Sequence, residues 1–162
     1  MKITINPYDG KSIHDALKAV IQYKSWLVLK EKQLLEKLAF MGATRVSLGF
    51  ARAVYKGDAD ITISTRITGN TAIIQANGEQ VAFIEFGAGV RFGYGYQGTR
   101  PEGIVGIGEY GKGKGKNPKG WWYTGANGSE HTYGNPPAQA LYTTVVELAE
   151  SITDIAKEVF RS

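Results

Sequence analysis

The stretch Val81–Gly89, with the sequence VAFIEFGAG, separates two parts of the chain that differ in composition. It is a run of apolar residues interrupted by one acid, Glu85, and it ends in two closely spaced glycines. Before it lie patterns typical of a long helix and several strands; after it come a glycine-rich basic segment, a strand and a last helix. We expect this stretch to join a packed α+β body to a loop that becomes ordered against neighbouring copies or other partners.

The segment that follows, about residues 88–120, concentrates the glycine and the positive charge of the chain. Fourteen of the 21 glycines lie in Gly87–Gly128. In Val90–Gly120, six basic residues stand against two acidic ones, an excess equal to the net charge of +4 of the whole chain. Glycine loses more backbone entropy on folding than any other residue, and long loops in compact domains are usually functional or disordered. We therefore predict a flexible loop on an electrically neutral body.

Length and composition fit a single domain over residues 1–162. A hydrophobic fraction of 43% and a charged fraction of 21% are ordinary for a soluble globular protein. No apolar run reaches the ~18 residues that suggest a membrane span. The N-terminal sequence MKITINPYDG lacks the apolar core of a secretory signal, so export by that route is not expected. The absence of cysteine excludes disulfides and thiolate metal sites.

A long helix is predicted near the start of the chain, from Ser12 to Met41. Its apolar residues recur at intervals of three, four or seven, which gives one apolar stripe along the helix. Ser12 and Asp15 are suited to form a capping pair, and Gly42 favours the left-handed conformation that ends a helix. At 1.5 Å per residue this helix would be about 45 Å long, which is more than the core of one such domain requires.

The period then changes to the alternation that is typical of strands. We predict antiparallel strands over Thr44–Tyr55, Asp60–Thr68 and Thr71–Ala76. The connecting turns are predicted at Lys56–Asp58 and at Gly69-Asn70, and the second is a two-residue turn suited to a tight hairpin.

Three further elements complete the predicted fold. Glu79–Phe86 is compatible with a two-turn helix ending at Gly87, and a fourth strand is the alternative, because periodicity cannot decide over eight residues. The aromatic cluster in Gly120–Thr124 predicts another strand. A last helix is predicted after Asn135, which is suited to cap it, with Pro136-Pro137 in its first turn. Together these elements predict a two-layer α+β domain, in which both long helices pack on one face of an antiparallel sheet of about four strands.

Patterns that would indicate an enzyme are incomplete. Gly106–Lys112 has the outline of a phosphate-binding loop, but Gly113 stands where a serine or threonine would bind magnesium, and no helix follows. The two histidines, His14 and His131, lack further ligands at metal-binding spacing. Ser129 and His131 could join a distant acid in a triad, but the nucleophile-elbow context is missing, so a solvated loop is favoured. We expect no catalytic residue, no metal and no cofactor.

Several residues are candidates for contact with a partner. Glu85 lies in an apolar stretch, so it either pairs with Arg91 or Arg100 of another subunit or points to solvent, which is slightly favoured. The loop lysines alternate with glycine beside aromatic residues, an arrangement that can hold a nucleic-acid backbone and stack bases; a solvated loop is the alternative. One candidate function is therefore a small nucleic-acid-binding module that uses the basic loop with Trp121 and Trp122. The full candidate interface comprises Glu85, Phe86, Arg91, Arg100, Lys112, Lys114, Lys116, Lys119, Trp121 and Trp122.

A series of short motifs runs from the central stretch to the last helix. The motifs are Ala82–Gly89 (AFIEFGAG), Gly111–Gly113 (GKG), Gly120–Tyr123 (GWWY), Thr132–Gly134 (TYG) and Pro136–Ala138 (PPA). In the order and spacing of these motifs the chain resembles the tail-component family of tailed bacteriophages over most of its length. It departs from the usual pattern at Tyr133, where the family has histidine, and at Ala88, where the family has threonine.

This resemblance implies a non-enzymatic structural protein of the phage neck, which joins head to tail or completes the tail. Such proteins are similar in fold to tail-terminator proteins and act as ring-shaped homo-oligomers through which DNA passes. The implied partners are further copies of the chain, other neck, head-closure or tail proteins, and DNA touched non-specifically in the channel; no membrane is implied. The implied location is the head–tail junction of the virion, and the host cytoplasm during assembly.

Overall fold

The computed structural model describes residues 2–55, 60–92, 95–102, 104, 108–125 and 127–161. Its helices are α1 (Gly10–Ala51), α2 (Val81–Phe86) and α3 (Ala140–Arg161), with a short 3-10 turn, η2, at Lys114–Lys116. Its strands are β1 (Thr62–Thr68), β2 (Thr71–Asn77), β3 (Trp121–Gly125) and β4 (Gly128–Thr132). The described strands form two antiparallel sheets of two strands each, β1–β2 and β3–β4. The fold is therefore α+β, as the sequence predicts, whereas the predicted single sheet of about four strands is wrong.

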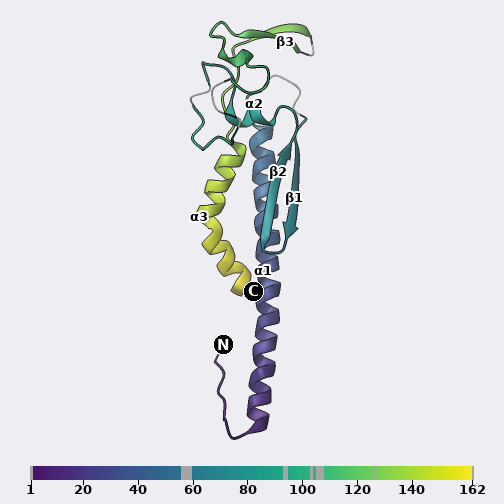
Figure 1. The fold of residues 1–162 in the computed structure, drawn as a ribbon, viewed down its shortest axis with the longest axis vertical. Helices are drawn as coiled ribbons and strands as arrows, with labels where there is room; N and C mark the ends of the chain where they lie inside the picture. Colours follow the sequence, from purple (N-terminus) through teal and green to yellow (C-terminus); the bar gives the residue numbers. More distant parts are fainter. Residues whose placement is uncertain are drawn as a thin grey trace.

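The first helix begins earlier than predicted and has a different cap. Asp9 supplies the cap, because its side chain accepts a hydrogen bond from the backbone N–H of Lys11 (3.0 Å). The hydroxyl of Ser12, the predicted cap, instead accepts a hydrogen bond from the backbone N–H of Asn6 (2.9 Å). The segment before the helix folds back along the first turns of α1 (Figure 1).

Gly42, the predicted end of this helix, lies inside it and is buried. A side chain at this position would collide with Ile74 of β2 and would press on Leu148 of α3. Glycine therefore serves close packing on both sides of α1 at this point, and it does not provide the left-handed turn that the sequence suggests.

The predicted strand over Thr44–Tyr55 is wrong, because α1 occupies this segment as far as Ala51. Apolar residues two apart fit a strand, but alternate members of the series also fit the four-residue spacing of a helix. Val46 and Phe50 are one helical turn apart, and both are buried in the main core with Ile84 of α2 and the start of α3. This core therefore lies where the end of α1 meets α2 and α3.

The β1–β2 hairpin follows the prediction. Thr68 pairs with Thr71 across the Gly69-Asn70 turn, and Gly69 has the positive φ (56°) that a tight hairpin turn favours. The hairpin packs along the C-terminal half of α1 (Figure 1). The other predicted turn, Lys56–Asp58, lies outside the described residues.

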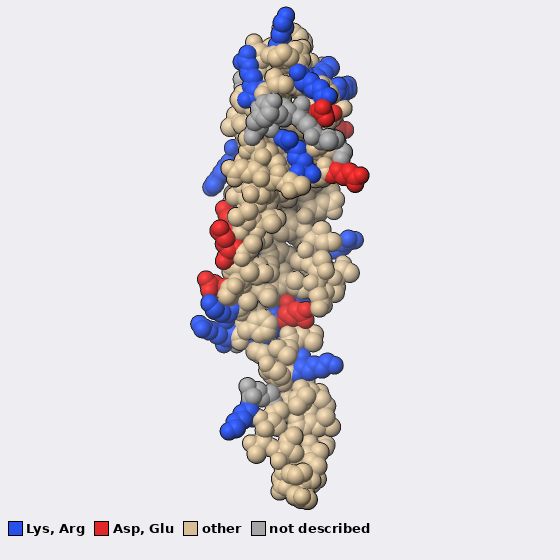
Figure 2. Space-filling view, turned by 60° about the vertical axis from the view of Figure 1, so that its left-hand side comes forward, with Lys and Arg blue, Asp and Glu red and all other residues tan. Residues whose placement is uncertain are grey.

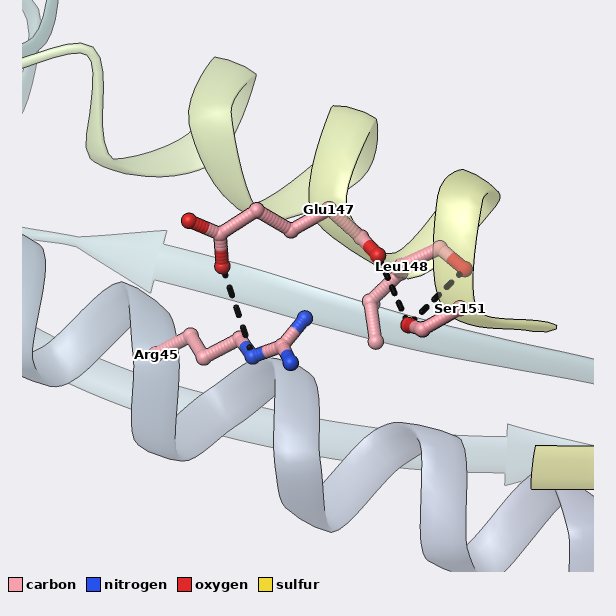
Figure 3. Close-up of polar contacts among 4 residues, drawn as sticks. All are labelled: Arg45, Glu147, Leu148 and Ser151. Atoms are coloured by element: carbon pink, nitrogen blue, oxygen red, sulfur yellow. Dashed lines mark hydrogen bonds and ion pairs between the residues drawn. The ribbon is translucent and has the colours of Figure 1, made fainter. Parts of the chain in front are cut away.

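The last helix, α3, packs against the C-terminal half of α1. Two ion pairs join these helices: Arg45 Nε lies 3.4 Å from Glu147 Oε2 (Figure 3), and Lys37 Nζ lies 2.5 Å from Glu158 Oε1. Both pairs are partly exposed, so they stabilise the contact less than the apolar packing does. In the described residues only α1 makes extensive contact with the hairpin, so the predicted packing of both long helices on one sheet face is not found.

The N-terminal part of α1 extends beyond the body formed by the rest of the fold (Figure 1). We call residues 10–25 the stem. Trp26, which follows the stem, marks where the body ends, because its ring packs edge-to-face on Phe160 near the end of α3 (5.8 Å between centroids). At 42 residues, α1 is about 63 Å long. No helix in the described part of the chain is both long and apolar enough to cross a membrane.

Candidate partner interface

The central stretch Val81–Gly89 folds as α2, which ends at Gly87 (φ 73°), as the sequence predicts. Its glutamate, Glu85, is 1% exposed and supplies the N-terminal cap of α3. The two carboxylate oxygens accept hydrogen bonds from the backbone N–H groups of Leu141 (3.0 Å) and Tyr142 (3.1 Å). These N–H groups have no partner within the helix, and the helix dipole favours negative charge at this end. A side chain of α2 thus accepts the free N–H groups at the start of a helix that lies more than fifty positions later in the chain.

This geometry corrects two expectations for Glu85. Its carboxylate does not point to solvent, and its hydrogen bonds to α3 hold it within its own subunit. Phe86 is also buried, at 7% exposed, and packs edge-to-face on Tyr96 (4.8 Å between centroids). Neither side chain is available to a partner in this structure. The other eight candidates lie at or near the surface, and their contact with a partner stays a prediction.

Backbone hydrogen bonds also join the end of α2 to the segment that leads into α3. Ala88 and Asn135 exchange two backbone hydrogen bonds (2.9 and 3.0 Å), and the side chain of Asn135 donates to the carbonyl of Phe83 (2.8 Å). Asn135 is therefore a link to α2 and not the predicted cap of the last helix, which begins only at Ala140. The chain enters α3 through Gln139, whose φ of 54° is the one positive value of a non-glycine residue in the described part.

The described part of the glycine-rich loop contacts the body. Tyr110 is buried and its ring lies 5.2 Å from that of Phe83 in α2. Gly108 and Gly115 approach so closely that a side chain on either would collide with the backbone of the other. The expectation that the loop depends on a partner for its order stays a prediction.

The basic candidates occupy different positions at this end of the molecule. Lys116 pairs with Glu109 (2.6 Å), and the guanidinium of Arg100 lies 5.9 Å from the ring centre of Tyr96. Lys112 and Lys114 line a groove of about 980 Å³ between the β3–β4 hairpin and the rest of the fold. Basic side chains are numerous at the β3–β4 end in Figure 2, where few acidic ones are visible.

The two adjacent tryptophans differ in exposure. Trp121 is partly buried, whereas Trp122 is 62% exposed, because successive residues of a strand point to opposite faces. β4 pairs with β3 and places His131 opposite Trp122. The sequence does not predict β4, because GSEHT is polar and carries no apolar alternation. The predicted nucleic-acid surface therefore retains Trp122 as its exposed tryptophan.

The face of the β3–β4 hairpin that carries the exposed Trp122 is here called the outer face. Four side chains form a continuous row at this face, and we call the row the aromatic ladder. The ring of Trp122 lies 5.1 Å from that of His131, and His131 lies 4.9 Å from Tyr133, in both cases edge-to-face. The guanidinium of Arg91 covers the Tyr133 ring at 3.7 Å. His131 and Tyr133 are not among the predicted site residues, and only the pairing of β4 with β3 brings them beside Trp122.

Three tyrosines among the described residues have raised pKa values. Burial raises the pKa of Tyr110 to about 12. Burial, and then the charge of Glu85, raises the pKa of Tyr96. The hydrogen bond that Tyr123 donates to Glu130 (2.8 Å) is the main cause of its raised pKa. All three phenols therefore stay protonated at neutral pH.

The second surface that lacks cover is the stem. Four of its apolar side chains lie on one helical stripe, because each of the others is three or four residues from Leu17. All four are about half exposed: Ile13 (47%), Leu17 (58%), Val20 (50%) and Ile21 (57%). The N-terminal segment lies along a different face, near Ala16 and Ala19. The visible side of the stem end in Figure 2 carries few charges. Soluble proteins usually use such a contiguous apolar surface for binding.

In the part of the chain that the structure describes, no three His, Asp or Glu side chains converge as a metal site would require. No protein-family model, curated protein or solved structure matches this chain.

Proposed function

We propose that this chain is a structural protein of the neck of a tailed bacteriophage, which assembles into a ring that joins head to tail or completes the tail. The observation that carries the proposal is the uncovered apolar stripe of the stem, at Ile13, Leu17, Val20 and Ile21. Contact of these apolar side chains with water is unfavourable, and burying them against a neighbouring subunit removes that cost. The resemblance of the central motifs to phage tail components supplies the biological setting.

A simple estimate shows what the stem can contribute. Full burial of one large aliphatic side chain is worth about 1.5–3 kcal/mol, so burying four half-exposed ones yields on the order of 3–6 kcal/mol. Association itself costs about 4–15 kcal/mol. The stem therefore needs a second contact, and Val145 (65% exposed) and Ile152 (45%) of α3 offer one. A contact between two different surfaces of the same subunit generates a ring when the rotation closes.

The protein should form multimers in native mass spectrometry and in size-exclusion chromatography with light scattering. The double variant Leu17→Gln, Ile21→Gln should shift the mass toward the monomer. A matched control is Lys18→Gln, Gln22→Ala, which changes two exposed residues of the same turns that are rotated by about 100° from Leu17 and Ile21. A wild-type chain that stays monomeric, alone and with phage neck proteins, would contradict the proposal.

The biological role needs a separate readout. In a phage whose own copy of the gene is disrupted, the wild-type chain should restore joined particles, whereas the stem variant should leave heads and tails unjoined or tails incomplete. Normal particle yield from the stem variant would count against a role for this surface in assembly.

A further inference from the structure

We propose that the outer face of the β3–β4 hairpin is a binding surface for single-stranded nucleic acid, with the aromatic ladder as its stacking platform. This surface is distinct from the stem, and the inference does not require that the chain form a ring. It rests on exposure, ring geometry and charge at the opposite end of the molecule.

The exposed rings of the ladder contribute little to the stability of the fold, because much of their surface stays in water. Trp122 is 62% exposed and Tyr133 42%, although their neighbours Trp121 and Thr132 turn inward and are partly buried. Large aromatic side chains in water carry a substantial unsatisfied apolar area. The edge-to-face contacts with His131 arrange Trp122 and Tyr133 in one row in the unliganded chain. The platform is therefore largely formed before any ligand arrives, which lowers the entropic cost of binding.

Positive charge surrounds this platform. Arg91 stacks on Tyr133 at one end of the ladder. The backbone carbonyl of Lys119 lies 3.0 Å from His131 Nε2, which places the backbone of this lysine next to the ladder. Lys112 and Lys114 line the adjoining groove, together with Trp122, His131 and Tyr133.

The acids nearby are engaged in bonds of their own. The carboxylate of Glu130, which also lines the groove, accepts the hydrogen bond of Tyr123, and Glu109 pairs with Lys116. The bond from the neutral Tyr123 phenol leaves Glu130 charged, but this one negative charge stands against four cations, Arg91, Lys112, Lys114 and Lys119. The charge around the ladder is therefore predominantly positive, which suits a polyanion.

Aromatic rings beside a basic track are the recognition chemistry of single-stranded nucleic acid. Unpaired bases can stack on exposed aromatic side chains, while lysine and arginine neutralise the phosphates without reading the sequence. A duplex offers its phosphates but keeps its base faces stacked inside. The ladder should therefore prefer single strands to duplexes of the same length and should show little sequence preference.

The test measures binding of the full chain to a fluorescent oligo-dT and to a duplex of equal length, by anisotropy at low and moderate salt. Trp122→Ala should weaken binding of the single strand by about five- to a hundredfold, the loss of one stacked base. The control is Tyr8→Ala, which removes a 97% exposed aromatic ring far from the ladder and should change nothing. Trp122→Phe keeps a stacking ring and should retain most of the affinity.

A second pair of variants tests the charges. Lys112→Ala, Lys114→Ala should lower the salt dependence of binding, since each lost phosphate contact on a single strand reduces the log–log slope by about 0.7. Lys18→Ala, Lys24→Ala removes the same charge from the stem and should leave that slope unchanged.

Three outcomes would overturn the inference: equal affinity of Trp122→Ala and wild type, equal affinity for duplex and single strand, or no binding at low salt. If Trp122→Ala lowers the oligomeric mass and leaves DNA affinity unchanged, the ladder is a subunit contact instead. Native mass spectra of the same samples keep the two proposals apart, because a monomer that binds oligo-dT would contradict the ring and leave this inference standing.

Discussion

At the scale of single residues, the decisive contact is the one between Glu85 and the start of α3. A carboxylate that is 1% exposed is costly to bury unless it is hydrogen-bonded, and here both oxygens accept backbone N–H groups of a helix terminus. The same bonds satisfy two donors that the helix itself cannot satisfy.

Replacing this carboxylate should therefore destabilise the fold. We expect Glu85→Ala to lower the free energy of unfolding by about 2–4 kcal/mol, because it leaves the partly buried N–H groups of Leu141 and Tyr142 without an acceptor. Glu85→Gln should cost less, since its amide oxygen can accept one of the two bonds. Urea unfolding followed by circular dichroism measures both, and Glu150→Ala on the exposed face of α3 is the control. Equal stability of Glu85→Ala and Glu150→Ala would contradict the capping role.

For Tyr110 we expect the opposite effect, no loss of stability on removing a polar group, because its buried hydroxyl has no hydrogen-bond partner among the described residues. Tyr110→Phe removes an unsatisfied polar group and should leave the stability at neutral pH unchanged or raise it by up to about 1 kcal/mol. A loss of more than that in urea unfolding would show that the hydroxyl is bonded.

The raised pKa of Tyr110 adds a pH dependence. Well below pH 10 the phenol is protonated in both states and contributes no difference. As the pH rises from 10 toward the folded value of about 12, only the unfolded chain releases the proton, so the folded state loses stability. Between pH 9 and pH 11, wild type should lose more stability than Tyr110→Phe. Parallel losses in the two proteins would be the contrary result.

At the scale of elements, α1 shows how glycine can serve packing inside a helix. A side chain at Gly49 would lie 2.7 Å from the Cβ and 3.0 Å from the Cα of Ala140, at the first turn of α3. Backbone cannot yield as a side-chain terminus can, so α3 would have to shift away from α1.

Gly49→Ala should therefore be destabilising by about 1–3 kcal/mol, even though alanine favours a helix by about 1 kcal/mol over glycine. Gly10→Ala is the matched control, because nothing lies within 4 Å of that position and the variant should be neutral or slightly stabilised. Thermal and urea unfolding of both variants test the contrast. If Gly49→Ala were as stable as Gly10→Ala, the close contact between the helices would be in doubt.

The elements that local patterns determine are the ones the sequence predicts. The Gly69-Asn70 turn fixes the β1–β2 hairpin, and Gly87 ends α2. The continuation of α1 past Gly42 cannot be predicted locally, because only contact with β2 and α3 shows that this glycine packs and does not terminate. The polar strand β4 and the cap from Glu85 depend on partners distant in sequence. Within the candidate site, exposed Trp122 and its lysines are predictable, whereas His131 and Tyr133 join them only through strand pairing.

At the scale of the whole molecule, the two ends carry different chemistry. The stem presents aliphatic side chains, and the β3–β4 end presents aromatic and basic ones, with the core formed by α1, α2 and α3 between them. An apolar surface at one end and a cationic surface at the other can engage different partners at the same time.

Hydrogen exchange should report the state of the stem. In a dilute monomer, the backbone amides of residues 10–25 should exchange fastest within α1, because hairpin and α3 cover only the later turns. When the protein assembles, protection should rise there and change little around Val46 and Phe50, which are already buried. Mass spectrometry at two protein concentrations gives the comparison. Uniform protection along α1 in the monomer would argue that the stem has intramolecular cover.

The backbone bridge between Ala88 and Asn135 has a consequence for how this architecture can vary. Because the chain departs and returns at adjacent positions, residues 89–134 form an excursion whose two ends are already in register. Such a segment can be lengthened, shortened or replaced without changing the distance between the end of α2 and the chain that leads into α3. Recognition at this tip is thus free to diversify while the scaffold beneath it keeps its dimensions.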